Sequence, residues 1–265
     1  MSDITLGQYI NGNSSVHRLD PRTKLILCIA FVVMLFTYKS LIQMAVITVY
    51  ILLIYALIRI PYKMLIRSLK PILPVIFITS FLNMFFVAGE PLISVWKITV
   101  TREGLYYAVM LSLRVILLLA GTSLLTYTTT PLQLTNALET LFKPFSKIGL
   151  PVHELSMMMT IALRFIPTLL DETQKIMSAQ KSRGANLDSG SFMEKIKALI
   201  PILIPLFVSA FRRADELALA MECRCYNGGE GRTRLHELKF QLNDLKATLV
   251  FFAAMIALYA AGAVL

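Results

Sequence analysis

The sequence predicts an all-α integral membrane protein, and its composition, the length of its apolar runs and its charge distribution support this class. Of the 265 residues, 56% are apolar and only 16% are charged. Water-soluble domains of this size have about 45–50% apolar and about 25% charged residues. The apolar residues also fall in long uncharged runs instead of an alternating pattern. A bilayer is therefore the expected solvent for much of the chain, which disfavours a soluble enzyme.

Five apolar runs are candidates for membrane-spanning helices. We expect crossings at residues 25–38, 40–58, 71–89, 105–126 and 247–265. A spanning helix needs roughly 20 residues. One helix through the first two runs would be about 51 Å long against a hydrocarbon core of about 30 Å, so a hairpin at Lys39 fits better. Because the first run is short, we expect Lys24 and Lys39 to extend their ammonium groups to the two interfaces.

A sixth apolar run, residues 198–211, is interpreted as lying outside the membrane. It contains Pro201 and Pro205, and a crossing there would place the basic stretches on its two sides in different compartments. The positive-inside bias disfavours that arrangement. Five crossings give a multi-pass protein of the cell membrane with a cytoplasmic N-terminus and a C-terminus outside. In this topology 22 of the 26 Lys and Arg residues are cytoplasmic.

The predicted organisation has four parts. Residues 1–24 form a cytoplasmic segment, residues 25–126 hold four crossings, residues 127–246 lie at the cytoplasmic face, and residues 247–265 form the last crossing. The cytoplasmic-face region begins with a short helix, Pro131–Phe142, that ends near Pro144 and is followed by a turn at residues 149–151.

Apolar residues at steps of three and four predict two long helices after that turn. The first set is Leu155, Met159, Ala162, Ile166, Leu169, Thr173 and Ile176, and the second is Ile196, Ile200, Leu203, Phe207, Phe211, Ala214, Ala218 and Met221. The simplest interpretation is a cytoplasmic domain whose helices cover one another. Residues 199–208 leave almost no polar face, however, so helices in the membrane interface or packed under other membrane helices explain the pattern better. Methionines at 157–159 and 177 supply adaptable surface for a partner, although such a stripe also suits a core.

Both long helices finish with an arginine between two small residues. The two endings are Ser182-Arg183-Gly184 and Cys223-Arg224-Cys225, where Gly184 or, further on, Gly228 and Gly229 can stop the helix. A guanidinium flanked by small side chains can enter a groove on another protein and pair with a carboxylate through two hydrogen bonds. The alternative is that arginine simply favours the helix C-terminal dipole. Because the pattern occurs twice, the docking interpretation and this alternative are equally supported.

The sequence lacks the motifs that indicate nucleotide binding, intramembrane carboxylate chemistry or metal binding. No G-x-x-x-x-G-K-[ST] stretch occurs, so we expect no P-loop ATP site. The five runs contain no Asp or Glu, which removes the usual intramembrane carboxylate chemistry. The pairs Asp171-Glu172 and Asp215-Glu216 lie beside basic residues and are interpreted as structural ion pairs. The three cysteines imply neither a disulfide framework nor a metal site.

The basic net charge and the single arginine within an apolar run need separate explanations. Topology accounts for the net charge of +10, so nucleic acid is not an expected partner. Arg114 lies inside the fourth run, where it could mark a functional site. The favoured interpretation is that it hydrogen-bonds backbone groups and hydroxyls, such as that of Thr122, or groups of a partner subunit.

The motifs resemble those of the transmembrane T subunit of energy-coupling factor transporters, a class of ABC-type micronutrient importers. The resemblance rests on the lead into the first run, residues 7–14 (GQYINGNS) and 17–25 (HRLDPRTKL), and on residues 164–167 (RFIP), 182–184 (SRG), 213–216 (RADE) and 220–222 (AME). It covers essentially the whole chain. Cys223 and Cys225 depart from the common Ala-Arg-Gly form of the second arginine triplet.

The resemblance implies that the two long helices are coupling helices beneath the membrane bundle. Their ends would dock into two cytosolic ATPase subunits through Ser182, Arg183 and Gly184 and through Cys223, Arg224 and Cys225. Their upper surface would hold a membrane-embedded, substrate-binding S subunit, and we assign this contact to Leu155, Met158, Met159, Ala162, Leu203 and Phe207. The chain itself would be non-catalytic and free of cofactors, since ATP and Mg²⁺ would bind the ATPases. The S subunit would select the vitamin or other micronutrient.

Two other functions are compatible with a polytopic membrane protein. A conventional ABC permease would carry its own translocation path and need no S subunit. An integral membrane enzyme that modifies lipids would need an acidic metal motif near the inner face, and none is visible in the sequence.

Overall fold

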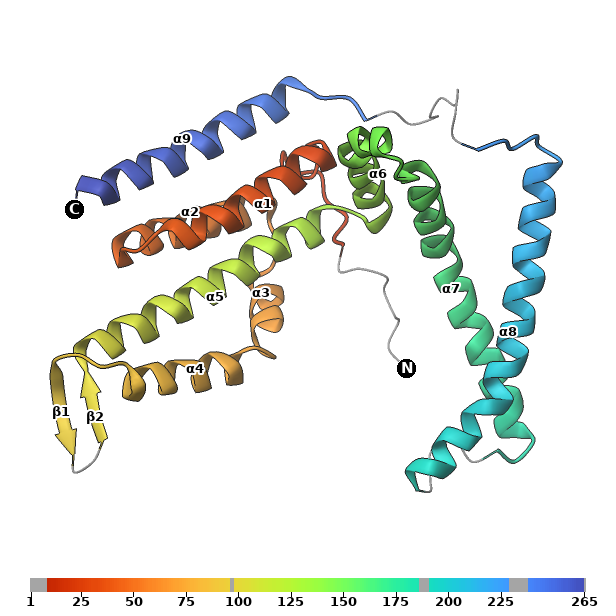
Figure 1. Ribbon diagram of the computed structural model, residues 1–265, viewed down its shortest axis with the longest axis horizontal. Helices are drawn as coiled ribbons and strands as arrows, with labels where there is room; N and C mark the ends of the chain where they lie inside the picture. The colour runs from red at the N-terminus through yellow and green to blue at the C-terminus, as the bar shows by residue number, and fades with distance from the viewer. Residues whose placement is uncertain (1–8, 96–97, 186–190, 229–237, 265) are drawn as a thin grey trace. The chain divides into compact units, whose positions relative to one another are not determined.

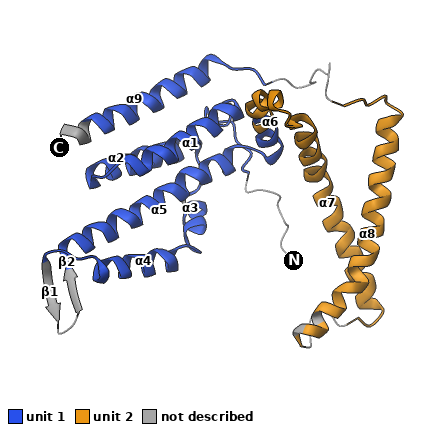
Figure 2. Ribbon diagram, viewed as in Figure 1, with its two compact units in different colours: residues 1–137, 238–265 blue, residues 138–237 orange. Residues whose placement is uncertain are grey.

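The computed structural model describes residues 9–95, 98–185, 191–228 and 238–264. Gly7 and Gln8 of the N-terminal motif, Gly229, and the last residue of the final expected crossing lie outside these ranges. The described chain forms two compact units, residues 1–137 with 238–265 and residues 138–237 (Figure 2). The second unit falls within the predicted cytoplasmic-face region, residues 127–246.

The first unit is built mainly from helices, together with one short hairpin (Figure 1). Its elements are α1 (Pro21–Thr37), α2 (Leu41–Ile58), α3 (Tyr62–Leu69), α4 (Leu73–Phe86), β1 (Pro91–Val95), β2 (Ile98–Thr101), α5 (Arg102–Thr128), the first half of α6 (Pro131–Phe142) and α9 (Leu242–Val264). The strands β1 and β2 pair antiparallel between α4 and α5. The sequence did not predict this hairpin, and the rest of the unit has the expected all-α architecture.

The helix boundaries follow from capping residues. The Asp20 carboxylate accepts a hydrogen bond from the Arg22 backbone N–H at the start of α1, and Pro21 occupies the first turn, where its missing N–H costs nothing. At the start of α2, the Gln43 side chain accepts from the Ser40 backbone N–H. The Thr101 hydroxyl caps α5 by accepting from the Gly104 N–H. Each cap satisfies a donor that a helix end otherwise leaves unpaired.

The predicted crossings correspond to helices of this unit. In the described chain, α2, α5 and residues 242–260 of α9 are each long and apolar enough to span a membrane. Helices α3 and α4 together meet the same requirement but are bent by 58° between Leu69 and Leu73. Helix α1 has 17 residues, which is about 26 Å against a hydrocarbon core of about 30 Å. The protein is therefore a multi-helix membrane protein, and the count of five crossings stays a prediction.

Helices α1, α2, α5 and α9 pack around one apolar core. Leu35, Met44, Ile47 and Met255 are fully buried at its centre. A Cβ atom built on Gly121 of α5 would lie only 2.3 Å from a ring carbon of Phe31 on α1. A glycine is therefore required for these two helices to approach so closely, as is common between membrane helices.

Polar side chains in this bundle donate hydrogen bonds to backbone carbonyls of neighbouring helices. The Tyr38 hydroxyl lies 2.7 Å from the Met255 carbonyl, and the Gln43 amide 3.0 Å from the Leu258 carbonyl, so both contact α9. The Tyr55 hydroxyl of α2 donates to the carbonyl of Ala120 on α5 at 2.9 Å. Burying such groups unpaired in an apolar medium would cost several kcal/mol, of order 4–8, so these bonds select one arrangement of the bundle.

The second unit contains the end of α6, a 3₁₀ helix (Lys143–Ile148), α7 (Val152–Ser182) and α8 (Phe192–Glu222). The predicted helix Pro131–Phe142 has the bounds of α6, and the predicted turn contains Gly149 at φ 87°. Both long predicted helices are present, each a few residues longer at its ends than the apolar pattern. Residues 198–211 lie inside α8, which is not among the described helices that could span a membrane.

Candidate partner-docking surface

Helices α7 and α8 contact each other in an antiparallel arrangement. Glu172 near the middle of α7 contacts Ser209 and Arg213 of α8, whereas Gln180, near the end of α7, contacts Pro201 nearer the start of α8. Figure 1 shows α8 beginning beside the end of α7 and running on to a distant end. The ends of the two helices, where the sequence places its two arginines, are therefore far apart.

A carboxylate joins the two helices at their contact. Glu172 accepts a hydrogen bond from the Ser209 hydroxyl, and its other oxygen lies 2.9 Å from an Arg213 nitrogen. This pair confirms the structural role predicted for Glu172. Because these side chains are only partly exposed, at 24% for Glu172 and 31% for Arg213, their attraction is screened less than at an open surface.

A second contact uses a carbonyl that a proline leaves free. Pro205 has no N–H to donate to the Pro201 carbonyl one turn earlier. The Gln180 side-chain amide of α7 donates to this carbonyl at 3.3 Å. The two prolines of α8 therefore create an acceptor that α7 uses. In the sequence, this free carbonyl is indicated by the four-residue spacing of the prolines. The sequence does not show which donor, elsewhere in the chain, bonds to it.

The face of α8 that packs on α7 differs from the predicted apolar face. The described residues of α8 that are not exposed are Ala198, Ile202, Leu206, Ser209, Ala210, Arg213, Leu217 and Met221. The predicted set is mostly exposed instead: Ile200, Leu203, Phe207 and Phe211 have exposed fractions of 45–66%. The reason is that α8 is apolar almost all round in this region, so the polar pairing with Glu172 decides which face turns inward.

The residues assigned to an S subunit are all exposed within this unit. On α7, Leu155 and Met159 are 48% exposed and Met158 57%, and Ala162 on the same stripe is exposed too. On α8, Leu203 is 45% and Phe207 60% exposed. We call these six residues the apolar surface of the coupling helices. Large apolar surfaces that stay uncovered mark contacts with proteins or lipid.

The two arginine ends share one backbone geometry. After α7, the Gly184 N–H donates to the Lys181 carbonyl and the Ala185 N–H to the Gln180 carbonyl, with Gly184 at φ 86°. After α8, the Cys225 N–H donates to the Glu222 carbonyl and the Tyr226 N–H to the Met221 carbonyl, with Cys225 at φ 54°. Both are Schellman closures. In each, the arginine directly precedes the left-handed residue.

All six docking candidates are exposed at these ends. They are Ser182, Arg183, Gly184, Cys223, Arg224 and Cys225. The expectation that Gly228 or Gly229 stops the second helix is wrong, because α8 ends at Glu222 and Cys225 makes the turn. Superposing the two closures pairs Gly184 with Cys225. The departure from the Ala-Arg-Gly form therefore places a cysteine where glycine has no steric cost.

Replacing Cys225 with glycine is expected to stabilise the end of α8. A non-glycine residue in the left-handed region costs roughly 1 kcal/mol, which the substitution removes. Amide hydrogen exchange in the last turn of α8 should slow by about fivefold. The matched reverse change, Gly184→Cys, meets no atom within 4 Å of its Cβ and should accelerate exchange at the end of α7 by a similar factor. Equal exchange in variant and parent would contradict the strain at Cys225.

A polar cluster not predicted from the sequence lies where α6 meets α7. The Glu139 carboxylate accepts a hydrogen bond from the Ser156 hydroxyl, and its other oxygen lies 3.1 Å from Nδ1 of His153. The carboxylate stands between the other two groups, so the histidine cannot activate the serine as a nucleophile needs. The cluster therefore ties α6 to α7 and offers no catalytic arrangement.

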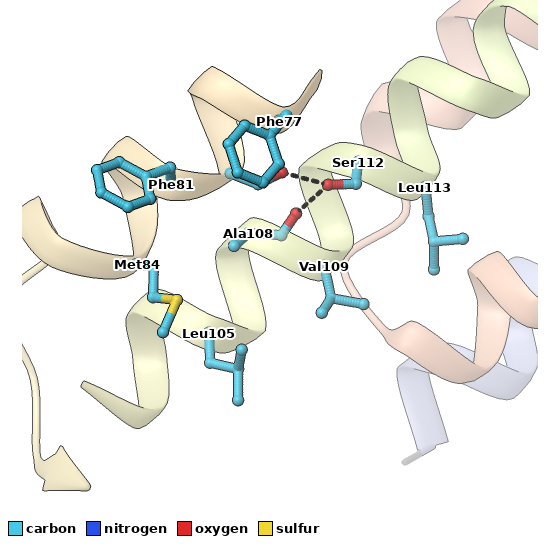
Figure 3. A pocket seen from close by; sticks show the side chains of 9 residues that line it. Phe77, Phe81, Met84, Leu105, Ala108, Val109, Ser112 and Leu113 are labelled. Atoms are coloured by element: carbon cyan, nitrogen blue, oxygen red, sulfur yellow. Dashed lines mark hydrogen bonds between the residues drawn. The ribbon is translucent and has the colours of Figure 1, made fainter. Parts of the chain in front are cut away.

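The first unit has an apolar pocket between α4 and α5 (Figure 3). Its volume is about 390 Å³, and its lining includes Phe77, Phe81 and Met84. The two lining hydroxyls, of Ser80 and Ser112, bond to each other at 2.6 Å, and Ser112 also donates to the Ala108 carbonyl. The polar groups are thus already satisfied, and the pocket lacks the convergent donors that orient a polar small molecule.

Arg114 and Lys24 both have hydrogen-bond partners within the first unit. Arg114 donates to the Tyr38 carbonyl at 2.8 Å and lies 5.7 Å from the Phe36 ring centre, so it bonds to backbone as expected, though not to Thr122. The prediction that Lys24 extends to the interface is wrong: it is buried and donates to the carbonyls of His17 and Thr128. Lys39 is exposed.

Comparison with known proteins connects these features to a family. Residues 12–235 match the family model CbiQ, described as cobalt transport protein. An energy-coupling factor transporter transmembrane protein EcfT of Acidaminococcus fermentans is 53% identical over 97% of this chain and 96% of its own length. Proteins of the same name from Thermosediminibacter oceani and Clostridium kluyveri are 50% and 51% identical, over 93% and 94% of this chain and 93% of each relative. The chain therefore belongs to the CbiQ family, as a transmembrane component of energy-coupling factor transporters.

Proposed function

We propose that this chain carries motion from two cytosolic ATPase subunits to a substrate-binding S subunit in the membrane, and so drives uptake of vitamins or other micronutrients. The observation that carries the proposal is the pair of helix closures with the same hydrogen-bond pattern. Each presents one exposed arginine, Arg183 or Arg224, at the end of a long helix. A guanidinium held by a fixed turn is suited to a bidentate contact with a carboxylate of a partner.

The separation of the two arginines supports two docking partners instead of one. Because Gln180 pairs with Pro201, Arg183 lies about level with Ala198, in the first third of α8. Arg224 follows the other end of α8, about 40 Å further along the helix at about 1.5 Å per residue. One small groove cannot receive both side chains. Two copies or two kinds of ATPase subunit, each with its own groove, fit this spacing.

The apolar surface of the coupling helices supports contact with a membrane-embedded partner. Its six residues carry no charge, and Met158 and Met159 are flexible enough to adapt to more than one partner surface. An S subunit that lies in the bilayer offers the matching apolar contact. Under this proposal the S subunit selects the substrate, which agrees with the apolar lining of the pocket in the first unit, where the two serine hydroxyls are already hydrogen-bonded.

In this proposal the partner ATPase subunits bind and hydrolyse ATP. The sequence has no P-loop motif, so ATP and Mg²⁺ would bind the ATPase subunits, and this chain would be a non-catalytic component without a cofactor of its own. The excess of Lys and Arg in the predicted cytoplasmic segments supports a cytoplasmic N-terminus and a C-terminus outside. The two arginine ends then face the compartment that contains ATP.

Reconstitution tests the proposal. The chain is co-expressed with candidate ATPase and S subunits, purified through a tag on the chain, and placed in proteoliposomes. We expect all subunits to co-purify, and ATP-dependent uptake to require every one of them. Uptake by the chain and ATPases alone would indicate a conventional permease, and lipid modification by the purified chain would indicate an enzyme. Either result would overturn the proposal.

A further inference from the structure

Four charged side chains form a buried cluster in the first unit. Asp20, Arg22 and Lys24 lie at the start of α1, and Asp244 lies in the first turn of α9. The exposed fractions of Asp20, Lys24 and Asp244 are 6%, 7% and 2%. Two cations and two anions balance, and charges so deeply buried persist only when paired and hydrogen-bonded.

Hydrogen bonds join three members of this charged cluster, Asp20, Arg22 and Asp244. Arg22 donates to both oxygens of Asp20, at 3.1 and 2.9 Å. The Asp20 backbone N–H donates to Asp244 at 2.7 Å, and the other Asp244 oxygen accepts from the Gln241 N–H at 2.8 Å. These bonds fix the start of α9 against the start of α1. Breaking them would leave charges uncompensated inside the protein, at a cost of several kcal/mol, of order 3–5.

The charged cluster also holds the chain at the end of α5, shortly before the first unit ends at Ala137. Lys24 donates to the carbonyl of Thr128 at 2.8 Å, and Thr128 is the last residue of α5. Helix α6, which continues into the second unit, begins only three residues later, at Pro131. The chain is therefore fixed to α1 immediately before α6, the helix that continues from the first unit into the second.

The same charged cluster holds the chain where it returns. Leu238 is the first residue of the first unit after the second unit ends. Its carbonyl accepts from Arg22 at 2.8 Å, and the Arg22 guanidinium lies 4.1 Å from the ring centre of Phe240. The two connections that lead from the helical bundle toward the second unit, residues 128–131 and 238–244, lie within the first unit. They are bound by Lys24 and Arg22 respectively, both in the first turn of α1.

The segment before α1 adds to this attachment. The His17 carbonyl is the second acceptor of Lys24, and the His17 ring lies 3.0 Å from the Ile10 carbonyl. Burial lowers the pKa of His17, which favours a neutral ring at neutral pH. Because a carbonyl only accepts, Nε2 carries the proton, and Nδ1 accepts from the Ser14 hydroxyl. The Ile10 N–H in turn donates to the carbonyl of Tyr127, beside Thr128.

We propose that Asp20, Arg22, Lys24 and Asp244 are positioning residues for energy coupling, which transmit movement of the coupling helices into the membrane bundle. This inference rests on the proposed function. Motion of the second unit can reach the first only through the two connections or through noncovalent contacts. A rigid attachment of both connections to α1, which packs on α5 and α9, makes the bundle follow that motion. Without it, bending at residues 128–131 and 238–241 absorbs the movement.

The test measures coupling in the complete complex in proteoliposomes. Lys24→Met removes the attachment of Thr128, and we expect substrate uptake per ATP hydrolysed to fall by about tenfold or more. Subunit association and ATP hydrolysis are expected to stay near the parent values. Lys24→Arg keeps donors for both carbonyls and should restore most of the coupling. Lys63→Met is the matched control, because Lys63 is an exposed cation of α3.

A second variant leaves every bond of the charged cluster in place. Two glycines inserted between Thr129 and Thr130 lengthen the connection between the bound Thr128 carbonyl and α6. We expect the same loss of uptake per ATP with an intact complex. Normal coupling in both variants, or loss of assembly in both, would overturn the positioning role. The parent complex separates the two proposals: if it fails to assemble or transport, the proposed function itself fails.

Discussion

Replacing Arg183 and Arg224 together with glutamate is expected to abolish association with the ATPase subunits. Each arginine precedes the left-handed residue of a helix closure, so the substitution leaves the backbone geometry unchanged. Interface arginines that pair with buried carboxylates contribute about 2 kcal/mol or more each, and two such losses weaken binding by about a thousandfold. Co-purification and binding to immobilised ATPase subunits measure the effect. Membrane insertion should be unaffected.

The control for this double variant keeps the same change in net charge on the same two helices. Lys175 of α7 and Arg212 of α8 are exposed, so Lys175→Glu with Arg212→Glu reproduces the electrostatic change away from the helix ends. ATPase binding by the control should remain within about threefold of the parent, as expected for screened surface charges. An undisturbed complex with Arg183→Glu and Arg224→Glu would refute the docking assignment.

Introducing glutamate at both Leu203 and Phe207 is expected to release the S subunit while the ATPases stay bound. Both side chains are exposed within the second unit, so their substitution leaves the contact between α7 and α8 intact. Burial of one large apolar side chain contributes about 1.5–3 kcal/mol, and an unpaired carboxylate adds a desolvation cost. Binding should weaken by about a thousandfold. Co-purification of each partner separates the two interfaces.

The matched control places two glutamates on another face of α8. Val208 and Leu219 are 55% and 63% exposed, and at about 100° per residue they lie well away from the stripe of Leu203 and Phe207. Val208→Glu with Leu219→Glu should leave S-subunit binding within about threefold of the parent. If the control releases the S subunit as strongly, the assignment of the apolar surface is wrong.

Helices with a local signal could be predicted from the sequence. The short helix Pro131–Phe142 has its predicted bounds, and the two long helices follow the three-and-four spacing of their apolar residues. The β1–β2 hairpin could not be predicted, because strands of five and four residues give too short an alternating pattern to compete with the apolar runs beside them.

Features that depend on distant partners could not be predicted either. The face by which α8 packs on α7 could not be read from the sequence, because Leu199 to Val208 is apolar on all sides and the choice is made by Glu172 of another helix. Burial of Lys24 depends on the carbonyl of Thr128, far away in the chain. The arginine ends could be found, because each is a local repeat in the sequence, but only the backbone shows that Cys225 replaces a left-handed glycine.

The small number of buried residues in the second unit affects how quickly the protein is degraded in the cell. Of the unit's described residues, only Ser156 and Ile202 are buried, so α7 and α8 leave many apolar side chains exposed, which the proposed partner subunits would cover. A copy synthesised without partners would present this surface to chaperones and membrane proteases, which remove proteins with exposed apolar segments. Turnover of surplus copies would then match the abundance of this protein to that of its proposed partner subunits.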